Sequence, residues 1–136
     1  MDLVTALKIS ASGMKAQGTR LRVLSENIAN ADSAAAGPGL SPYRRKVVTF
    51  ANTLDRALGA ETVKVNRVSE APGVFPMRYD PSHPAANNDG YVQLPNVNVL
   101  IEMMDFREAQ RSYEANLNVL EASKRMIEST IQILRA

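Results

Sequence analysis

The chain has 136 residues, of which 45% are hydrophobic, and its formal net charge at pH 7 is +2. This length and composition suit one compact domain, or one compact insert carried between long helical arms. The absence of cysteine excludes disulfide bonds and thiolate metal sites. No apolar run approaches the roughly 20 residues that a bilayer requires. Lys8, Ser10 and Ser12 interrupt the first apolar positions, so we expect neither a membrane span nor a secretory signal peptide.

The first predicted element is a long helix over residues 3–30, for which Asp2 is a suitable N-terminal cap. Two rows of mostly apolar residues repeat every seven positions along it: Leu7, Met14, Leu21 and Ile28, and Leu3, Ser10, Gln17 and Leu24. Heptads of this kind keep one face of a helix turned toward a partner helix and favour a left-handed supercoil. We therefore assign residues 1–32 to an N-terminal coiled-coil arm.

The middle of the chain, residues 33–95, predicts a small irregular β-containing module. Its segments are a loop at 32–42, a short strand at 46–50, a brief helix or turn at 51–58, extended runs at 62–65 and 74–79, and turns over 80–95. Pro76 argues against a central strand in the second extended run.

A second long helix is predicted after Pro95, capped by Asn96 or Asn98 and continuing to about residue 135. Ten positions follow the same rhythm of three and four, and eight are apolar or aromatic: Met103, Phe106, Gln110, Tyr113, Leu117, Leu120, Lys124, Ile127, Ile131 and Leu134. Residues 96–136 form the C-terminal coiled-coil arm in this interpretation.

These stripes predict a mainly α fold in which the long terminal helices pair as a coiled coil, with the β module between them. One stripe alone would equally fit a helix that faces an ordinary core. The charges favour pairing, because residues 3–28 carry a balance of +3 and residues 99–134 a balance of −2. The predicted assembly seam comprises Leu3, Leu7, Met14, Leu21, Leu24, Ile28, Met103, Phe106, Tyr113, Leu117, Leu120, Ile127, Ile131 and Leu134. Contacts outside the seam are expected at Val23, Leu24, Met104 and Val119.

Two features invite a chemical interpretation. His83, between two prolines and flanked by Asp80 and Asp89, resembles a metal ligand or general base, although a turn residue is the more ordinary interpretation. The basic run at residues 44–46 suits phosphate, but a solvated or subunit-contacting face is the more common explanation of such a run. There is no second histidine and no glycine-rich phosphate loop. We expect no catalytic, cofactor-binding or metal-binding residue.

Specific motifs support an assembly role. Residues 13–21, followed by Asn27-Ile28-Ala29-Asn30, resemble the N-terminal signature of the axial proteins of the bacterial flagellum, and Ser112-Tyr113-Glu114-Ala115-Asn116 resembles their C-terminal signature. Residues 42–46, 79–85, 89–92 and 95–103 look like the short proximal-rod members of that family, so the resemblance covers nearly the whole chain. Ser33 departs from the family's usual threonine but keeps a hydroxyl, and residues 34–40 match less well. The motif residues are Asn27, Asn30, Tyr113, Glu114 and Asn116.

The resemblance implies a structural subunit of the flagellar basal-body rod, which crosses the periplasm and transmits torque. It also implies assembly with copies of itself and other rod proteins, and delivery by the flagellar type III export apparatus without a cleaved signal. No nucleic acid, membrane insertion, cofactor or enzymatic activity is expected. The alternative is a soluble coiled-coil adaptor or regulator that binds a single partner, although such a protein has no need for the mid-chain motifs.

Overall fold

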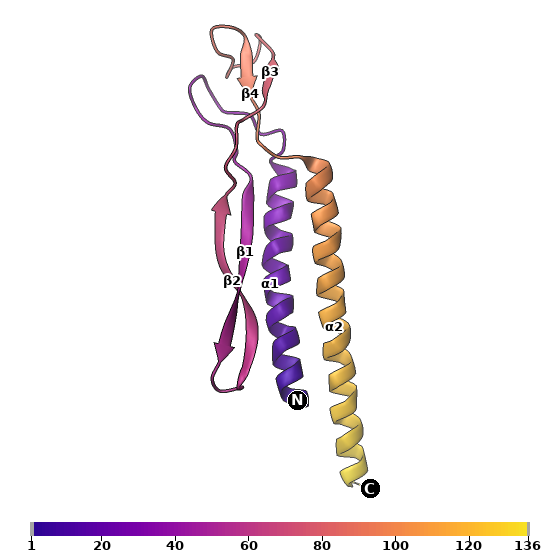
Figure 1. Cartoon of the computed structure of the whole chain (residues 1–136). Helices are drawn as coiled ribbons and strands as arrows, with labels where there is room; N and C mark the ends of the chain where they lie inside the picture. The colour runs from indigo at the N-terminus through magenta and orange to yellow at the C-terminus, as the bar shows by residue number, and fades with distance from the viewer. Residues whose placement is uncertain (1, 136) are drawn as a thin grey trace. The chain divides into compact units, whose positions relative to one another are not determined.

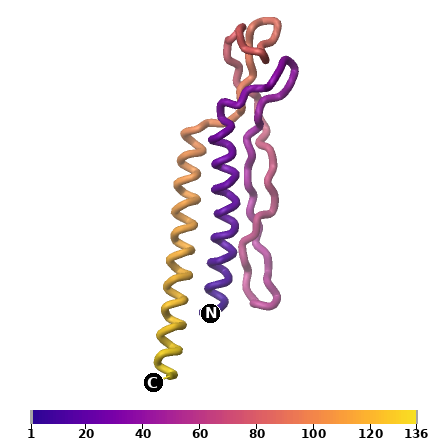
Figure 2. Tube along the Cα trace, turned by 180° about the vertical axis from the view of Figure 1, so that it is seen from behind, coloured from indigo at the N-terminus to yellow at the C-terminus, as the bar shows by residue number. Residues whose placement is uncertain are grey.

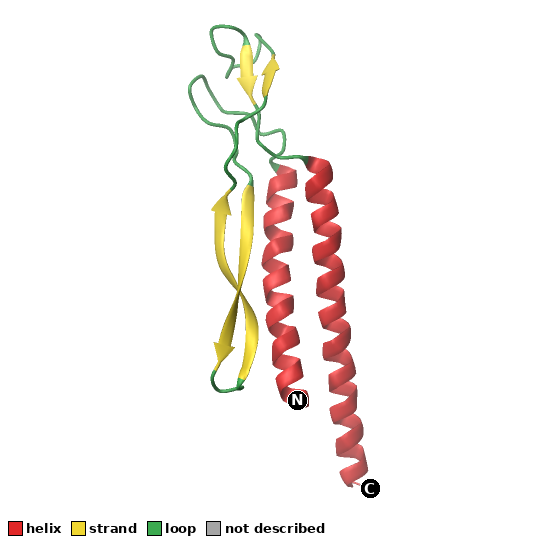
Figure 3. Ribbon diagram, in the orientation of Figure 1, coloured by secondary structure: helices red, strands yellow, loops and turns green. Residues whose placement is uncertain are grey.

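The computed structural model describes residues 2–135 and contains two long helices and two pairs of strands (Figures 1 and 3). The elements in chain order are α1 (Leu3–Ala29), β1 (Lys46–Asp55), β2 (Ala60–Glu70), β3 (Met77–Tyr79), β4 (Tyr91–Gln93) and α2 (Val99–Arg135). The prediction of a mainly helical chain, with long terminal helices and a small β-containing module between them, is confirmed. No helix within residues 2–135 is both long enough and apolar enough to span a membrane.

Both long helices begin and end at residues suited to those positions. The Ala6 amide donates to the Asp2 carbonyl at the start of α1, and Asn30 Nδ2 donates to the Glu26 carbonyl at its end, 2.8 Å away. Asn30 therefore acts as a C-terminal cap. At α2, Asn98 Oδ1 accepts hydrogen bonds from the amides of Leu100 and Ile101, which makes Asn98 the N-cap.

Strands β1 and β2 form a two-stranded hairpin. Asp55 Oδ1 accepts hydrogen bonds from two amides of the connecting turn, and Gly59 has a positive φ of 61° that favours glycine. The prediction of a brief helix or turn from residue 51 was wrong for residues 51–55, which continue β1. Pairing with β2 decides their conformation, as strand propensity depends strongly on neighbouring strands.

Strands β3 and β4 pair antiparallel, with Met77 opposite Gln93, Arg78 opposite Val92 and Tyr79 opposite Tyr91. Sequence analysis placed only turns over residues 80–95 and therefore missed β4, which is three residues long. Val92 is fully buried and packs with Ala35 and Ala85 in a small apolar cluster.

The chain divides into two compact units, each containing part of both helices and part of the hairpin. The first unit comprises the residues up to Leu21, Val48–Arg67, and the residues from Arg107 onward. The second comprises Arg22–Val47 and Val68–Phe106, including β3 and β4. Within each unit, the segment of α1 lies between the hairpin and the segment of α2 (Figures 1 and 2).

Candidate assembly surface

In the first unit, α1 and α2 are in close contact at Gly13. A Cβ atom at this position would come within 3.0 Å of the Asn116 amide group, so the helix spacing depends on glycine here. Asn116 Nδ2 donates to the Ser112 carbonyl, which fixes the amide beside Gly13. An ion pair between the half-buried Arg20 and the exposed Glu108, at 4.0 Å, also joins the helices of this unit.

In the second unit, the helices meet through buried polar groups. Asn27 and Glu102 are both fully buried, and Asn27 Nδ2 donates to Glu102 Oε2 over 2.9 Å. Arg45 Nε donates to Glu102 Oε1, and its Nη2 lies 3.9 Å from Asp105 Oδ2. The Glu102 carboxylate is therefore paired with a guanidinium and an amide, which a buried charge requires.

Ion pairing and burial shift three pKa values beside this contact. A hydrogen bond from Lys46 lowers the pKa of Glu26, and the same bond raises the pKa of Lys46. Burial raises the pKa of Tyr43, whose hydroxyl donates to Asn27 Oδ1. The first residues of β1 and the end of α1 are thus connected by both charge and hydrogen bonding.

The predicted seam residues of α1 are covered within the single chain. Leu24 is buried, and the others are half-buried: Leu3, Leu7, Met14, Leu21 and Ile28. Val23, which sequence analysis placed outside the seam with Leu24, is also buried, so neither is free for a further contact.

The predicted seam residues of α2 divide into two groups. Half-buried members are Phe106, Tyr113, Leu117, Leu120 and Ile127, whereas Met103, Ile131 and Leu134 are exposed and lie outside the contact between α1 and α2 of one chain. The buried α2 residues are Glu102, Ala109 and Ser123. They belong to a row that repeats every seven residues and also includes Asn116; each member directly precedes a member of the row of Met103 in the sequence. Alanine and serine at two of its positions allow the helices to approach closely, whereas Glu102 is a long side chain held by Asn27 and Arg45.

A second apolar row on α2 faces outward. Its sequence spacing places its large members on one face of the helix. These members are Ile101, Met104, Val119, Met126 and Ile133. Met104 is 71% exposed and Ile133 is 76% exposed. The expectation that Met104 and Val119 are available for further contacts agrees with this exposure. A helix with apolar residues on two faces is suited to more than one helical partner.

The remaining motif residues occupy different environments. Tyr113 is half-buried on the side of α2 that faces α1, while Glu114 is exposed and accepts a hydrogen bond from Gln110 Nε2. Spacing alone could not reveal the multiple contacts of Asn27, although its place in the Asn27-Ile28-Ala29-Asn30 motif marked it as special.

The two features with a possible chemical role have structural explanations. His83 Nδ1 accepts a hydrogen bond from the Ala85 amide, as in a turn. Arg44 donates to the carbonyls of Ala71 and Gly73, and Lys46 pairs with Glu26. Within residues 2–135, no group of three or more acidic, histidine or cysteine residues is arranged to hold a metal ion.

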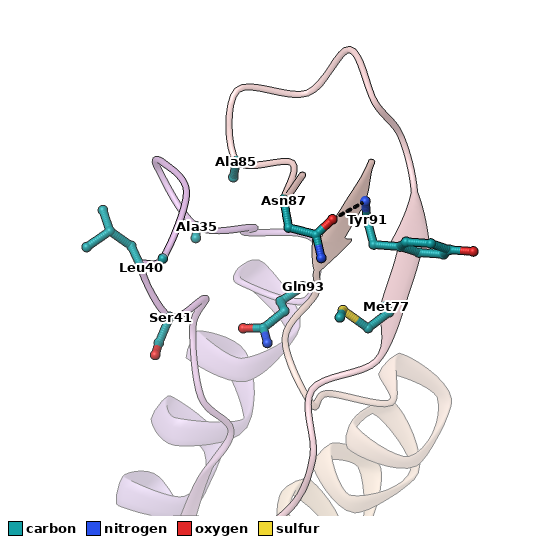
Figure 4. Close-up of a pocket in the computed structure, with 9 residues that line it drawn as sticks. Ala35, Leu40, Ser41, Met77, Ala85, Asn87, Tyr91 and Gln93 are labelled. Carbon is teal, nitrogen blue, oxygen red and sulfur yellow. Dashed lines mark hydrogen bonds between the residues drawn. The ribbon is translucent and has the colours of Figure 1, made fainter. Parts of the chain in front are cut away.

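The second unit also has a surface cavity of about 240 Å³ beside β3 and β4 (Figure 4). In this close-up, Leu40 and Tyr91 extend away from one another, and Asn87 Oδ1 accepts the Tyr91 amide hydrogen. Neutral side chains and glycine line the cavity: Ala35, Gly39, Leu40, Ser41, Met77, Ala85, Asn87, Tyr91 and Gln93. This lining offers hydrogen bonding and apolar contact but no charged group.

Both terminal regions of the chain match families of flagellar rod proteins. The family described as flagella basal body rod protein matches residues 7–35. The family described as flagellar basal body rod FlgEFG protein C-terminal matches residues 88–133. Both are families of rod proteins rather than of enzymes.

Individual relatives extend the similarity over nearly the whole chain. The flagellar basal-body rod protein FlgC of Agrobacterium fabrum is 53% identical over 134 residues, covering 98% of this chain and 96% of the relative. FlgC of Salmonella typhimurium is 42% identical and covers 98% of each chain. FlgC of Bacillus subtilis is 38% identical, covering 98% of this chain and 99% of the relative. The resemblance inferred from the motifs is confirmed, and the chain belongs to the FlgC family of flagellar basal-body rod proteins.

Proposed function

We propose that this chain polymerises through its terminal helices into the proximal rod and transmits torque mechanically, without catalysis. Membership of the FlgC family makes it a structural subunit of the flagellar basal-body rod. The proposal adds the surface through which the subunit assembles. The observation that carries it is the outward apolar row of α2, which remains exposed although α2 already contacts α1.

The outward row provides a driving force for assembly. Burying one large apolar side chain contributes about 1.5–3 kcal/mol, so several residues on one face supply much of the energy of a helix contact. The last turns of α2 add Ile131 and Leu134, which are 45% and 82% exposed. In an open helical assembly, successive subunits contact different faces of one another, which suits a helix with two apolar rows.

We assign a separate structural role to each of the three segments of the chain. Residues 1–32 and 96–136 are the arms that form the rod core, with the predicted seam residues as their contact positions, and residues 33–95 are the module between them. Interlocked side chains between packed helices resist sliding. A shaft built from such arms therefore resists twisting.

The proposed partners are copies of this chain and other rod proteins, after passage through the flagellar type III export apparatus without a cleaved signal peptide. The proposed location is the periplasmic rod of the basal body. We assign no nucleic-acid partner and no membrane insertion. The pairing of Arg45 and Lys46 with carboxylates supports the first assignment, because those cations already have anionic partners.

Deletion of the gene, followed by electron microscopy of isolated basal bodies, tests this function. The intact chain should restore missing rods, whereas Met104→Asp and Val119→Asp chains should not, because each places a charge in the outward apolar row. Asn118→Asp, which adds the same charge at an exposed position of this helix outside that row, is the matched control and should restore rods. Intact rotating flagella in the deletion strain would instead favour a single-partner adaptor.

A further inference from the structure

We propose that Glu102 is a positioning residue that sets the register of α1 against α2 in the second unit. Asn27, Arg45 and Glu102 together are called the register lock. The inference rests on the proposed function, because the register of α2 determines where Ile101 and Met104 are presented to a neighbouring subunit. Its physical basis is a buried carboxylate whose partners come from two other elements of the fold.

The register lock joins three parts of the second unit. Glu102 comes from the first turns of α2, Asn27 from the last turn of α1, and Arg45 from the residue before β1. The Glu102 side chain is 1% exposed, and one carboxylate oxygen accepts from Asn27 while the other accepts from Arg45. Few other positions of α2 would satisfy both donors.

Asn27 is held firmly enough to serve as the reference point. Its Nδ2 donates to the Lys46 carbonyl as well as to Glu102, both over 2.9 Å. Its Oδ1 accepts from the Tyr43 hydroxyl at 2.8 Å and from the Lys46 amide at 2.9 Å. These four bonds use both donors and both acceptor positions of the side-chain amide, and three of them come from Tyr43 and Lys46, so its orientation is fixed mainly by β1 and the residues before it.

The apolar row of Phe106, Tyr113, Leu120 and Ile127 alone defines the register of α2 poorly, because it repeats every seven residues. A slip of α2 by one heptad would again place an apolar or aromatic residue at every position of this row. The same slip would bring Ala109 or Pro95 to the place of Glu102 and leave Asn27 and Arg45 without their buried acceptor. A single polar residue in an otherwise apolar seam is a well-attested way to select one register.

A distance measurement separates positioning from simple stabilisation. Nitroxide labels at Ala29→Cys and Met104→Cys occupy exposed sites of the second unit, and the chain has no other cysteine. The purified full chain should give one narrow distance distribution. Arg45→Met/Glu102→Leu replaces the ion pair with apolar side chains and should still unfold cooperatively. We expect this variant to show a second population at a different distance, because a slip of one heptad moves the label on α2 by about 10 Å along the helix axis.

Two controls make the result specific. Glu102→Gln retains one of the two acceptor oxygens at the same position and should keep the original distance as its larger population. Arg20→Met/Glu108→Leu makes the same changes in the exposed ion pair of the first unit, where Glu108 is 70% exposed, and should leave the distance unchanged.

An unchanged single distance in Arg45→Met/Glu102→Leu would overturn the proposal. A broad distance distribution in the chain without lock substitutions would also overturn it, because the lock would then not select one register. Loss of cooperative unfolding in the double variant would overturn it as well, because the lock would then stabilise the fold rather than select its register. Rod restoration by the intact chain is scored separately by electron microscopy. Failure there rejects the proposed function, whereas restored rods with an unchanged distance reject only the register lock.

Discussion

The two units use the same helix pair in different ways. In the first unit, Gly13 and Asn116 allow a close approach, and the ion pair between the helices is exposed. In the second, Asn27 and Glu102 are fully buried and connected to Arg45. One row with a seven-residue repeat on each helix therefore allows close packing of the helices in the first unit. In the second unit, the same two rows provide buried polar contacts between the helices.

The units also differ in how completely their buried polar groups are satisfied. Gln17 Oε1, in the first unit, is buried and has no hydrogen-bond partner among the described residues. It lies beside a cavity of about 380 Å³ that Gly13 and Asn116 also line. Asn27, in the second unit, makes four hydrogen bonds. We infer that local stability is greater in the second unit, which leads to the following predictions.

The largest effect is expected from Arg45→Met alone. This change leaves the Glu102 carboxylate buried without its cation, so the free energy of unfolding should fall by about 3 kcal/mol, as for other broken buried ion pairs. Urea unfolding of the full chain measures the loss. The comparison is Glu108→Ala in the exposed ion pair, which should cost less than about 1 kcal/mol. Equal losses of unfolding free energy in the two variants would show that the buried and the exposed ion pair contribute alike to stability.

Gly13→Leu should destabilise the first unit by about 1–3 kcal/mol, because the new side chain overpacks the helix contact. Adding Asn116→Ala should recover part of the loss by removing the group that a Cβ at Gly13 would meet. The matched change Gly18→Ala has no heavy atom within 4 Å of the new Cβ and should stabilise α1 by about 1 kcal/mol. Thermal unfolding distinguishes these outcomes, and equal effects at Gly13 and Gly18 would contradict the close contact.

Replacing Gln17 by leucine should raise the free energy of unfolding by about 1 kcal/mol, since the buried acceptor that lacks a partner is removed. Asn27→Leu should have the opposite sign, because it leaves the groups that bond to Asn27 unsatisfied. Urea midpoints of the two variants provide the measurement. A destabilised Gln17→Leu chain would show that its carbonyl has a partner in solution.

The smallest expected effect is a pH dependence at Glu26. Its pKa is lowered by the hydrogen bond from Lys46, so this contribution to stability is present above the ordinary value of 4.5 and is lost as pH falls through the depressed value. Because the Glu26 side chain is partly exposed to solvent, the loss of stability should be small. In the Glu26→Gln chain, the urea midpoint should depend less on pH below about pH 4.5 than it does in the unchanged chain. If both chains lose stability equally as the pH falls, Glu26 does not cause the loss.

Periodicity predicted the long helices because each is many turns long: residues 3–30 were expected and α1 covers Leu3–Ala29. Helix α2 begins at Val99, directly after Asn98, which is one of the two expected caps. The exact buried row of α2 could not be found this way. A search for bulky apolar residues selects Met103, whereas the close helix contact requires Ala109 and Ser123. Glu102 was missed because a charged residue ordinarily marks a solvated position. Only the fold brings Arg45 to it.

The most direct test of the account is the accessibility of the outward row before and after assembly. Val119→Cys should react quickly with a maleimide in the free chain, where residue 119 is 48% exposed, and should be protected in isolated basal bodies. Ala109→Cys, at a fully buried position, should react slowly in both. Rapid labelling of Val119→Cys in intact basal bodies would contradict the claim that this face joins neighbouring subunits.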